Sequence, residues 1–273
     1  MRRLRPMSAA SAAPARPATT ADADVAAILR WWDAHARTVP WRTSRDVYAI
    51  WVAEVMSVQT TVRRAAAAWS QWMRRWPSVD ALAAASLVEV LAEWQGLGYP
   101  RRARDLHRSA RIVVVQGWPG DLTELPGVGP YVAAAVRCFA NEEPVLPLDV
   151  NVRRVLDRRF RGGVDISADA WRAAQAIMEF GQRICSARPK CEPCPVRTGC
   201  GGPGAPADLP ADRRRGGRGR FEGSVRQRRG QLLRQVLAEG SVMVPEVDRH
   251  VAAGLAQDGL AVLAGGVLLA PPG

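Results

Sequence analysis

The sequence predicts a mainly α-helical protein with a small winged-helix-like module of helices and a hairpin at its C-terminus. Three observations lead to this fold class. Apolar residues over 21–200 recur at spacings of three and four positions, as on helices with one buried face. Few stretches alternate between apolar and polar residues as half-buried strands do. Beyond residue 223, two amphipathic segments precede two short β-type runs joined by Gly265 and Gly266.

The helices can be placed in order along the chain. Val25, Ile28, Leu29 and Trp32 share one face of the first helix. Further helices or helical turns are expected near residues 46–59, 61–74, 79–84, 87–95, 101–116, 121–124, 130–140, 150–160 and 168–184. Glycine and proline mark the joints between them, at Gly96, Gly98, Pro119, Pro126 and Pro147. Most of the ten tryptophans lie on apolar helix faces, so we expect nearly all of them in the core.

Three segments differ in composition from this helical body. Residues 1–22 are rich in Ala, Pro, Arg and Ser and lack the apolar segment of a signal peptide, which predicts a disordered tail. Residues 201–223 are predicted to form a basic linker, either solvated or acting as an arm that follows DNA phosphates. The winged-helix-like module over 224–273 is expected to contain helices over 227–237 and 244–257 and a hairpin over 262–269.

The chain is strongly basic, with a formal net charge of +12. This charge favours a nucleic-acid partner, with solubility as the alternative reason. Lys190 is the only lysine, so nearly all of the positive charge is arginine, which binds phosphate through paired N–H groups. The scarcity of lysine also argues against Schiff-base chemistry. No apolar run approaches the ~20 residues of a membrane span, so we expect a cytoplasmic protein with no membrane contact.

Four cysteines lie close together near the end of the helical body, in the pattern Cys185-x5-Cys191-x2-Cys194-x5-Cys200. Such a group in a cytosolic chain predicts a metal site that holds either zinc or a [4Fe–4S] cluster, with purely structural cysteines as the alternative. The intervening loops carry Arg188, Lys190 and Arg197, which suit a phosphate backbone. The fifth cysteine, Cys138, lies on an apolar helix and is expected in the core.

A glycine-containing segment and two acidic residues complete the set of motifs. Gly127 and Gly129 lie just before the helix that carries Tyr131, which predicts either a simple turn or a helix-hairpin-helix clamp for phosphate. Asp149 stands where a helix should begin, as an N-cap residue would. Glu54 lies among apolar residues of a helix, and by itself it would be read as a surface glutamate.

These motifs occur in the order found in the adenine DNA glycosylases, the MutY family of the helix-hairpin-helix superfamily. The sequence resembles that family over residues 24–200, on the segments 39–42, 54–60, 96–104, 125–131, 149–155 and the four cysteines. The resemblance implies a two-lobed glycosylase fold over 23–200. A six-helix lobe would cover about 44–148, and a cluster lobe would combine 23–43 with 149–200. It also implies a [4Fe–4S] cofactor bound by the four cysteines.

The implied activity is that of a monofunctional glycosylase in base excision repair. It would hydrolyse the N-glycosidic bond of adenine mispaired with 8-oxoguanine or guanine in double-stranded DNA, as a monomer at the nucleoid. Glu54 would protonate the leaving base, with a pKa raised by its apolar neighbours. Asp149 would face the developing cation of the sugar. Tyr131 and Asn151 match family positions that support this chemistry.

The resemblance also suggests residues that contact DNA, and it has clear departures. The expected DNA-binding residues are Arg42, Gln59, Thr60, Tyr99, Gly127, Gly129, Arg153, Arg188 and Lys190. The first cysteine loop is one residue shorter than is usual in the family. Val58 replaces a second glutamine before Thr60, and Pro100 follows Tyr99 where a second tyrosine is common. About fifty C-terminal residues are too few for the Nudix-like domain of long family members.

Three alternatives stay open at this point. The first is a mismatch thymine or other-base glycosylase of the same fold, although Glu54 favours a base whose ring nitrogen takes a proton. The second is a non-catalytic DNA-binding protein that uses the hairpin, the cysteine loop and the C-terminal module. The third is a zinc-finger-like structural protein, which the long helical body disfavours.

Overall fold

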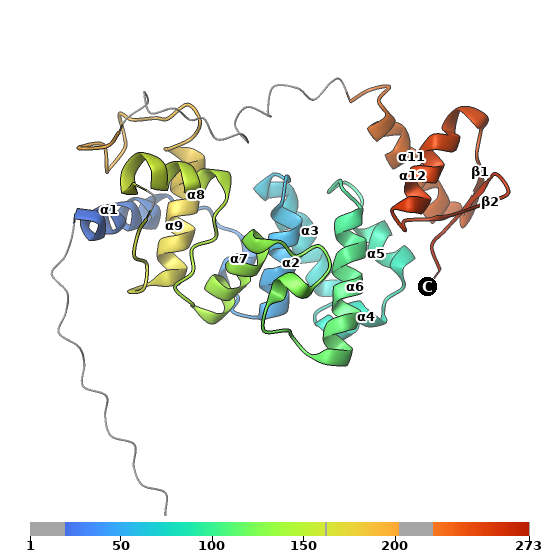
Figure 1. Ribbon diagram of the computed structural model, residues 1–273, viewed down its shortest axis with the longest axis horizontal. Coiled ribbons are helices and arrows are strands. Elements are labelled where there is room, and N and C mark those ends of the chain that lie inside the picture. Colours follow the sequence, from blue (N-terminus) through green and yellow to red (C-terminus); the bar gives the residue numbers. More distant parts are fainter. Residues whose placement is uncertain (1–19, 162, 202–220, 273) are drawn as a thin grey trace, which may run out of the picture.

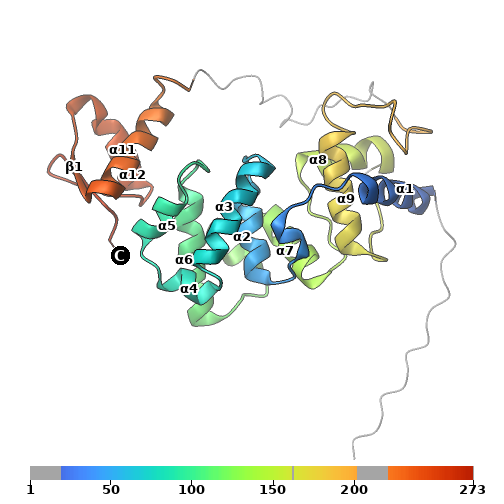
Figure 2. The same cartoon turned by 180° about the vertical axis from the view of Figure 1, so that it is seen from behind.

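The computed structural model describes residues 20–161, 163–201 and 221–272. Figure 1 shows a body of helices with a separate small unit at the C-terminal end, and Figure 2 shows the same arrangement from behind. Most of the tail predicted over 1–22 and most of the linker predicted over 201–223 lie outside the described residues.

The helical body follows the predicted order of helices. Its α-helices are α1 (Thr20–His35), α2 (Val47–Ser57), α3 (Val62–Arg75), α4 (Val79–Ala84), α5 (Leu87–Glu93), α6 (Arg101–Gln116), α7 (Pro130–Asn141), α8 (Val150–Val155) and α9 (Ala170–Arg183). Short turns complete it at η1 (Pro40–Thr43), η2 (Leu122–Glu124) and η3 (Leu156–Phe160). Side-chain caps explain several starts, because they satisfy backbone N–H groups of the first turn. Asp46 accepts from the N–H of Ala49, and Ser86 forms a capping box with Glu89.

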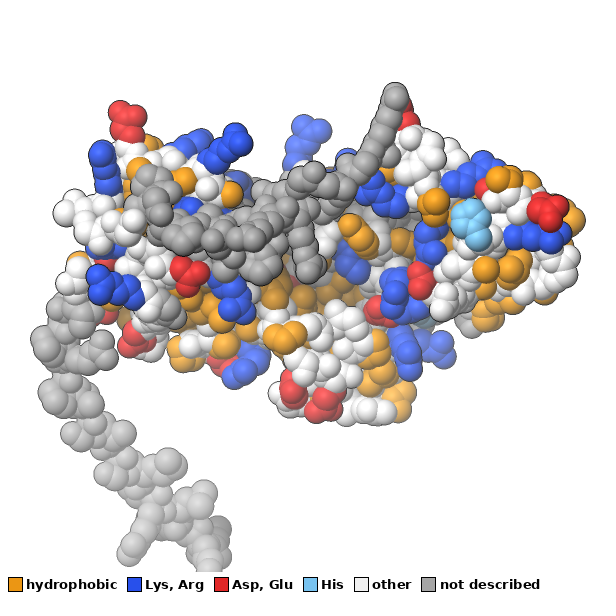
Figure 3. Space-filling view, turned by 45° about the horizontal axis from the view of Figure 1, so that its top comes forward, with side chains coloured by type: hydrophobic (Ala, Val, Ile, Leu, Met, Phe, Trp, Pro, Cys, Tyr) orange, Lys and Arg blue, Asp and Glu red, His pale blue; other side chains and the backbone are white. Residues whose placement is uncertain are grey.

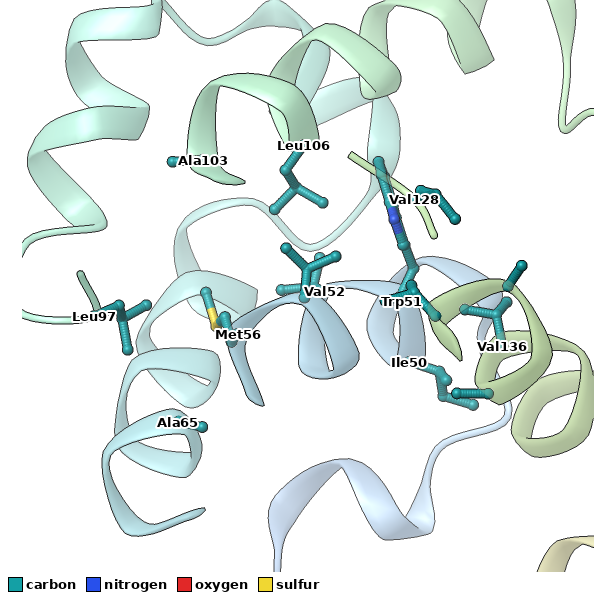
Figure 4. Packing of buried hydrophobic residues seen from close by; sticks show 14 of the residues in the cluster. Ile50, Trp51, Val52, Met56, Ala65, Leu97, Ala103, Leu106, Val128 and Val136 are labelled. Atoms are coloured by element: carbon teal, nitrogen blue, oxygen red, sulfur yellow. The ribbon is translucent and has the colours of Figure 1, made fainter. Parts of the chain in front are cut away.

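Helix α2 lies at the centre of the body. Every residue from Tyr48 to Met56 is buried, as expected for a helix that is apolar around its whole circumference. Figure 4 shows Val52 of α2 pointing toward Leu106 of α6, and Met56 at the other end of the helix near Leu97. This position carries Glu54, the one acidic residue of α2, into the interior of the protein.

The helices form two groups on either side of α7. Helices α2 to α6 pack together, whereas α1 and α8 both pack on α9, and Figures 1 and 2 show α1, α8 and α9 side by side. Helix α7 contacts both α2 and α9. At Gly181 of α9, a Cβ atom would lie 2.7 Å from the carbonyl oxygen of Asn151 on α8, so only glycine permits this approach. The two carboxylates singled out above come from different groups.

Five of the ten tryptophans are buried in the core, and four more are partly buried against it, whereas the sequence predicted nearly all of them in the core. Trp51, Trp72 and Trp94 are almost fully buried, and Trp72 donates its indole N–H to the hydroxyl of Tyr48. Trp118 departs from the prediction, because it is 36% exposed and packs edge-on against Trp51 from the surface.

The C-terminal unit contains α11 (Val225–Glu239), β1 (Ser241–Met243), η5 (Glu246–Asp248), α12 (Arg249–Gln257), β2 (Val262–Ala264) and β3 (Val267–Leu269). The predicted hairpin is confirmed, because β2 pairs antiparallel with β3 across Gly265 and Gly266, both of positive φ. Strand β1 was not predicted and pairs with the other edge of β3. The prediction of a helix starting at residue 244 was wrong. Pro245 interrupts the segment, and the N–H of Val244 instead bonds to the carbonyl of Gly266.

Candidate active site

A cleft of about 960 Å³ opens between the two groups of helices. Its walls come from α2, the turn after α2, and helices α7, α8 and α9. The structure brings seven of the residues singled out from the sequence to its lining: Arg42, Glu54, Gln59, Thr60, Tyr131, Asp149 and Asn151. Glu54 and Asp149, which are 95 positions apart in the chain, therefore face one space.

Glu54 is the buried acid of the cleft. Its side chain leaves α2 with only 6% of the residue exposed, which confirms the predicted burial. Its pKa is raised from 4.5 to about 7. Burial is the main cause of the rise, a hydrogen bond from Tyr131 opposes it, and the nearby charge of Asp149 adds to it. The carboxyl group can therefore hold a proton near neutral pH, as an acid catalyst requires.

Tyr131 supports Glu54 from the first turn of α7. Its hydroxyl donates to Oε2 of Glu54 at 3.0 Å. Burial raises the pKa of Tyr131 well above 10, and the nearby charges of Glu54 and Asp149 raise it further. The hydroxyl thus stays protonated and remains a donor. It occupies one oxygen of the Glu54 carboxyl group and leaves the other for a ligand in the cleft.

Asp149 caps α8, and its orientation is fixed by three donors. Its Oδ1 accepts from the backbone N–H groups of Asn151 at 2.8 Å and Val152 at 2.7 Å. Its Oδ2 accepts from the side-chain amide of Asn151 at 2.6 Å. The interpretation as an N-cap is therefore confirmed, and the same geometry directs the carboxylate into the cleft. A negative charge at a helix N-terminus is also stabilised by the helix dipole.

Arg154 is a buried neighbour of Asp149 and Asn151 that was not predicted from the sequence. It is 3% exposed and donates to Oδ1 of Asn151 at 3.3 Å and to the carbonyl of Cys185 at 3.2 Å. Arg154 therefore links the cap of α8 to the start of the cysteine loop. The available signal was its position three residues after Asn151, which places both side chains on one helix face.

Glu179 on α9 was also missed, and it changes the interpretation of Arg42. Arg42 donates to Glu179 at 3.0 Å and to Gln175 at 3.2 Å. Burial alone would raise the pKa of Glu179, but bonds from the backbone of Arg37 and from the guanidinium groups of Arg42 and Arg183 lower it overall. The donors of Arg42 therefore hold the fold together, and the predicted DNA contact of Arg42 gains no support. The sequence signal that could have revealed Glu179 was its position on an otherwise apolar face of the predicted helix.

Gln59 and Tyr99 lie on two loops whose backbones approach each other. Gln59 follows α2 and is exposed, and Tyr99 precedes α6 with 50% of its surface exposed. Both have left-handed backbone angles, with φ of 54° and 50°. The hydroxyl of Thr60 donates to the carbonyl of Leu97 at 3.4 Å, which joins the two loops.

The turn that the sequence predicted as the hairpin of a helix-hairpin-helix motif lies directly before α7. Gly127 has a φ of 76°, and a Cβ atom there would lie 2.8 Å from Cβ of Asp105 on α6, so both the backbone angle and the space require glycine. Gly129 is the N-cap residue of α7. Three other residues expected to bind DNA are exposed and do not line the cleft: Arg153, Arg188 and Lys190.

The four cysteines of the loop are free thiols. Burial raises the pKa of Cys194, and the charges of Cys185, Cys200 and Cys191 raise it further, so the four sulfur atoms lie within electrostatic reach of one another. Arg158 donates to the sulfur of Cys185 at 3.7 Å. In the part of the chain that the structure describes, no three His, Cys, Asp or Glu side chains gather tightly enough to bind a single metal ion.

Among residues 20–161, 163–201 and 221–272, no helix combines the length and the apolar character needed to cross a membrane.

Comparisons with known proteins agree with this geometry. Residues 52–180 match the HhH-GPD superfamily of base excision DNA repair proteins. The chain is 39% identical over 250 residues to the adenine DNA glycosylase of Mycolicibacterium smegmatis, covering 82% of this chain and 83% of that protein. It is 37% identical over 255 residues to the adenine DNA glycosylase of Mycobacterium tuberculosis, covering 82% of each. A solved thermostable thymine-DNA glycosylase is similar with a TM-score of 0.59 and 27% identity, over 66% of this chain and 94% of that one.

Proposed function

The chain belongs to the adenine DNA glycosylases of the HhH-GPD superfamily, and we propose that its substrate is adenine mispaired with 8-oxoguanine or guanine in double-stranded DNA. One observation supports this proposal most strongly. A buried, protonatable Glu54 and a capped Asp149 face the same cleft. The target nucleotide would have to leave the base stack to reach them.

The two carboxyl groups suit the two requirements of base release. As the bond between sugar and base breaks, the leaving adenine gains electron density and the sugar gains positive charge. Glu54 donates its proton to a ring nitrogen of the base, and Tyr131 holds the carboxyl group in place. Asp149, held by Asn151 and the start of α8, places its negative charge beside the sugar. Water then adds to the sugar carbon, and the proton that it loses returns to the Glu54 carboxylate.

A thymine mismatch glycosylase is the second candidate, because a structural relative of that kind shares 27% of its sequence with this chain. Glu54 favours adenine over thymine. A purine ring nitrogen accepts a proton in the transition state, and a buried acid with a pKa of about 7 can supply it.

The proposed DNA contacts surround the cleft. Gln59, Thr60 and Tyr99 would meet the bases, and the backbone N–H groups near Gly127 and Gly129 would bind phosphate. Arg153, Arg188 and Lys190 would add charge on the side of the cysteine loop. In the view of Figure 3, blue Lys and Arg side chains occur from the helical body to the C-terminal unit, consistent with a polyanionic partner. We propose that the protein binds its DNA as a monomer, at the nucleoid.

An excision assay tests the substrate and the monofunctional mechanism together. The protein should release adenine from duplexes that pair it with 8-oxoguanine or guanine, and should leave thymine in G–T and uracil in G–U pairs intact. The product strand should stay uncut until alkali is added, because the chain has only Lys190 for Schiff-base chemistry, and that residue lies outside the cleft. A borohydride-trapped covalent adduct would contradict monofunctional hydrolysis. Release of thymine but not adenine would support the second candidate.

We propose that Cys185, Cys191, Cys194 and Cys200 bind a [4Fe–4S] cluster. A single zinc ion needs its ligands gathered around one point, whereas a cluster takes one thiolate at each iron. Four thiolates from one short loop, with Cys194 near enough to the other three to feel their charges, match the ligand set of a [4Fe–4S] cluster. When bound, the cluster would hold the loop over 185–200 in place beside Arg154 and Arg158.

Protein purified without oxygen should contain about four irons per chain and absorb visible light. Replacing Cys194 with serine should abolish both signals, because one iron loses its ligand. The matched control is Cys138→Ala, which removes a buried thiol outside the loop and should keep the full iron content. A colourless protein with stoichiometric zinc would overturn the cluster assignment.

The domain organisation follows from the same proposal. Residues 23–200 form the glycosylase core, with a six-helix lobe over about 44–148 and a cluster lobe from 23–43 and 149–200. The C-terminal unit over 224–273 is a winged-helix-like module, which its order of helices and its three-stranded antiparallel sheet support. The segment 201–223 connects the two.

A further inference from the structure

Two loops beside the cleft hold non-glycine residues in a strained backbone region. Gln59 follows α2 with a φ of 54°, and Tyr99 precedes α6 with a φ of 50°. Residues that carry a side chain rarely adopt these backbone angles. They keep such angles only where surrounding contacts impose them. Gln59 is exposed, and Tyr99 is half exposed with its ring 5.5 Å from the guanidinium carbon of Arg102. Contacts with the backbone can restrain both loops.

One arginine supplies such contacts to both loops at once. Nη1 of Arg102 donates to the carbonyl oxygens of Val55 at 2.7 Å and Val58 at 2.6 Å. Nη2 donates to the carbonyl oxygens of Leu97 at 3.1 Å and Gly98 at 3.2 Å. The first pair of carbonyls belongs to the end of α2, and the second pair to the loop before α6.

The chemistry of the contact suits arginine in particular. The last carbonyls of a helix have no partner within it and carry partial negative charge, so a cation is favoured there. A planar guanidinium can direct two nitrogens at two separate pairs of oxygens, which a lysine ammonium cannot do. The group is part-buried and lies over the ring of Trp94, whose indole N–H also donates to Gly98. Burial lowers the pKa of Arg102, which reflects this enclosed setting.

We propose that Arg102 is a positioning residue. Its hydrogen bonds fix the turn that carries Gln59 and the loop that carries Tyr99 relative to each other, so that the two form one rigid surface for contact with DNA bases, the DNA-reading edge. The DNA contact in this inference rests on the function proposed above, whereas the locking rests on the four hydrogen bonds. Since Arg102 also holds the end of α2, the edge keeps a fixed position relative to Glu54. Recognition of the base opposite the adenine and transfer of the proton thus share one rigid unit.

Hydrogen–deuterium exchange of the intact protein tests the locking without any substrate. Arg102→Met keeps the length of the side chain and removes every donor. It should speed amide exchange at least about tenfold in peptides that contain Gln59 and in peptides that contain Tyr99, because each loop loses charge-assisted hydrogen bonds. Arg108→Met is the matched control, since Arg108 is exposed on the same helix, and exchange in both loops should match the wild type.

Binding in a Glu54→Gln background tests the reading role, because that protein should bind DNA while it releases base at least about a hundredfold more slowly than the wild type. Adding Arg102→Met should lower the preference for a duplex with adenine opposite 8-oxoguanine over an undamaged duplex by about tenfold. Affinity for the undamaged duplex should change less than about twofold, because phosphate contacts elsewhere are kept. Arg102→Lys should restore only part of the preference, and Arg108→Met should leave it unchanged.

Each outcome decides the inference. Faster exchange in one loop alone, or in neither, would overturn the locking. Joint loosening of the loops with an unchanged preference would overturn the reading role, and so would equal losses of affinity on both duplexes, as partial unfolding produces. If the wild-type protein releases no adenine, the proposed function fails, and the exchange measurement still decides whether Arg102 locks the loops.

Discussion

Replacing Asp149 with asparagine should slow release of adenine by about two to three orders of magnitude, while the protein still binds substrate DNA. The variant removes the negative charge that faces the sugar, and fixed charges of this kind contribute about 10²–10³ in rate. The fold should survive, because asparagine is also a favoured N-cap residue and can accept the same backbone hydrogen bonds at the start of α8. Single-turnover excision and DNA-binding titrations measure the two effects separately.

Asp169→Asn is the matched control for this variant. Asp169 caps α9 by accepting from the N–H of Arg172, and it does not line the cleft. It undergoes the same chemical change at the same kind of helix start, and it should keep the wild-type rate. Equal rates for wild type and Asp149→Asn would exclude the proposed role of the carboxylate. If neither the wild-type protein nor Asp149→Asn releases any base, the chain is a DNA-binding protein without this activity.

Replacing Glu54 with glutamine should lower the rate by about 10²–10⁴, because the leaving base loses its proton donor.

The wild-type rate should also depend on pH. With a pKa of about 7, Glu54 is protonated below that pH, so single-turnover excision should fall as pH rises through 7. The glutamine variant should be slow and independent of pH in this range. Tyr131→Phe should move the wild-type midpoint upward, because the hydrogen bond from Tyr131 lowers the pKa of Glu54. A wild-type rate that rises through pH 7 would contradict the acid role.

The stability of the protein should fall over the same pH range as its activity, because both depend on the neutral form of Glu54. The folded pKa of about 7 lies above the unfolded value near 4.5, so stability from neutral Glu54 is complete below about pH 4.5 and is lost as pH rises through 7. The shift corresponds to roughly 3 kcal/mol. Glu54→Gln should therefore raise the melting temperature relative to wild type above pH 7, and the gain should shrink in acid. An equal gain at all pH values would indicate a cause other than ionisation.

The sequence predicted most helices of the body because local signals agree with the final packing there. Asp46 and Ser86 cap helices where apolar periodicity begins, and Gly127 marks a turn that only glycine can form. The C-terminal unit was harder to predict. Strand β1 has only three residues, and Pro245 interrupts an amphipathic pattern that otherwise resembles a helix.

The acids of the candidate site and the two residues that hold them, Tyr131 and Asn151, were predictable from the sequence, but Arg102 was not. Glu54 and Asp149 lie in recognisable motifs, whereas the partners of Arg102 are backbone carbonyls from two distant loops, and a carbonyl has no sequence signature. The role of Arg42 shows a different limit. An arginine in a basic chain suggests a phosphate contact, and only tertiary packing reveals that Arg42 also bonds to Glu179 where it lines the cleft.

The contact between Gly181 and the backbone of Asn151 has a consequence for how this site can change over time. The residue that lets α8 approach α9 has no functional group at all, and its contribution is the absence of a single carbon atom. Any replacement adds that atom between α9 and the turn that orients Asp149. The chain therefore cannot explore other residues there one mutation at a time, however neutral they are in charge or polarity. The position of the catalytic carboxylate thus depends on a contact between two backbones that leaves no room for a side chain.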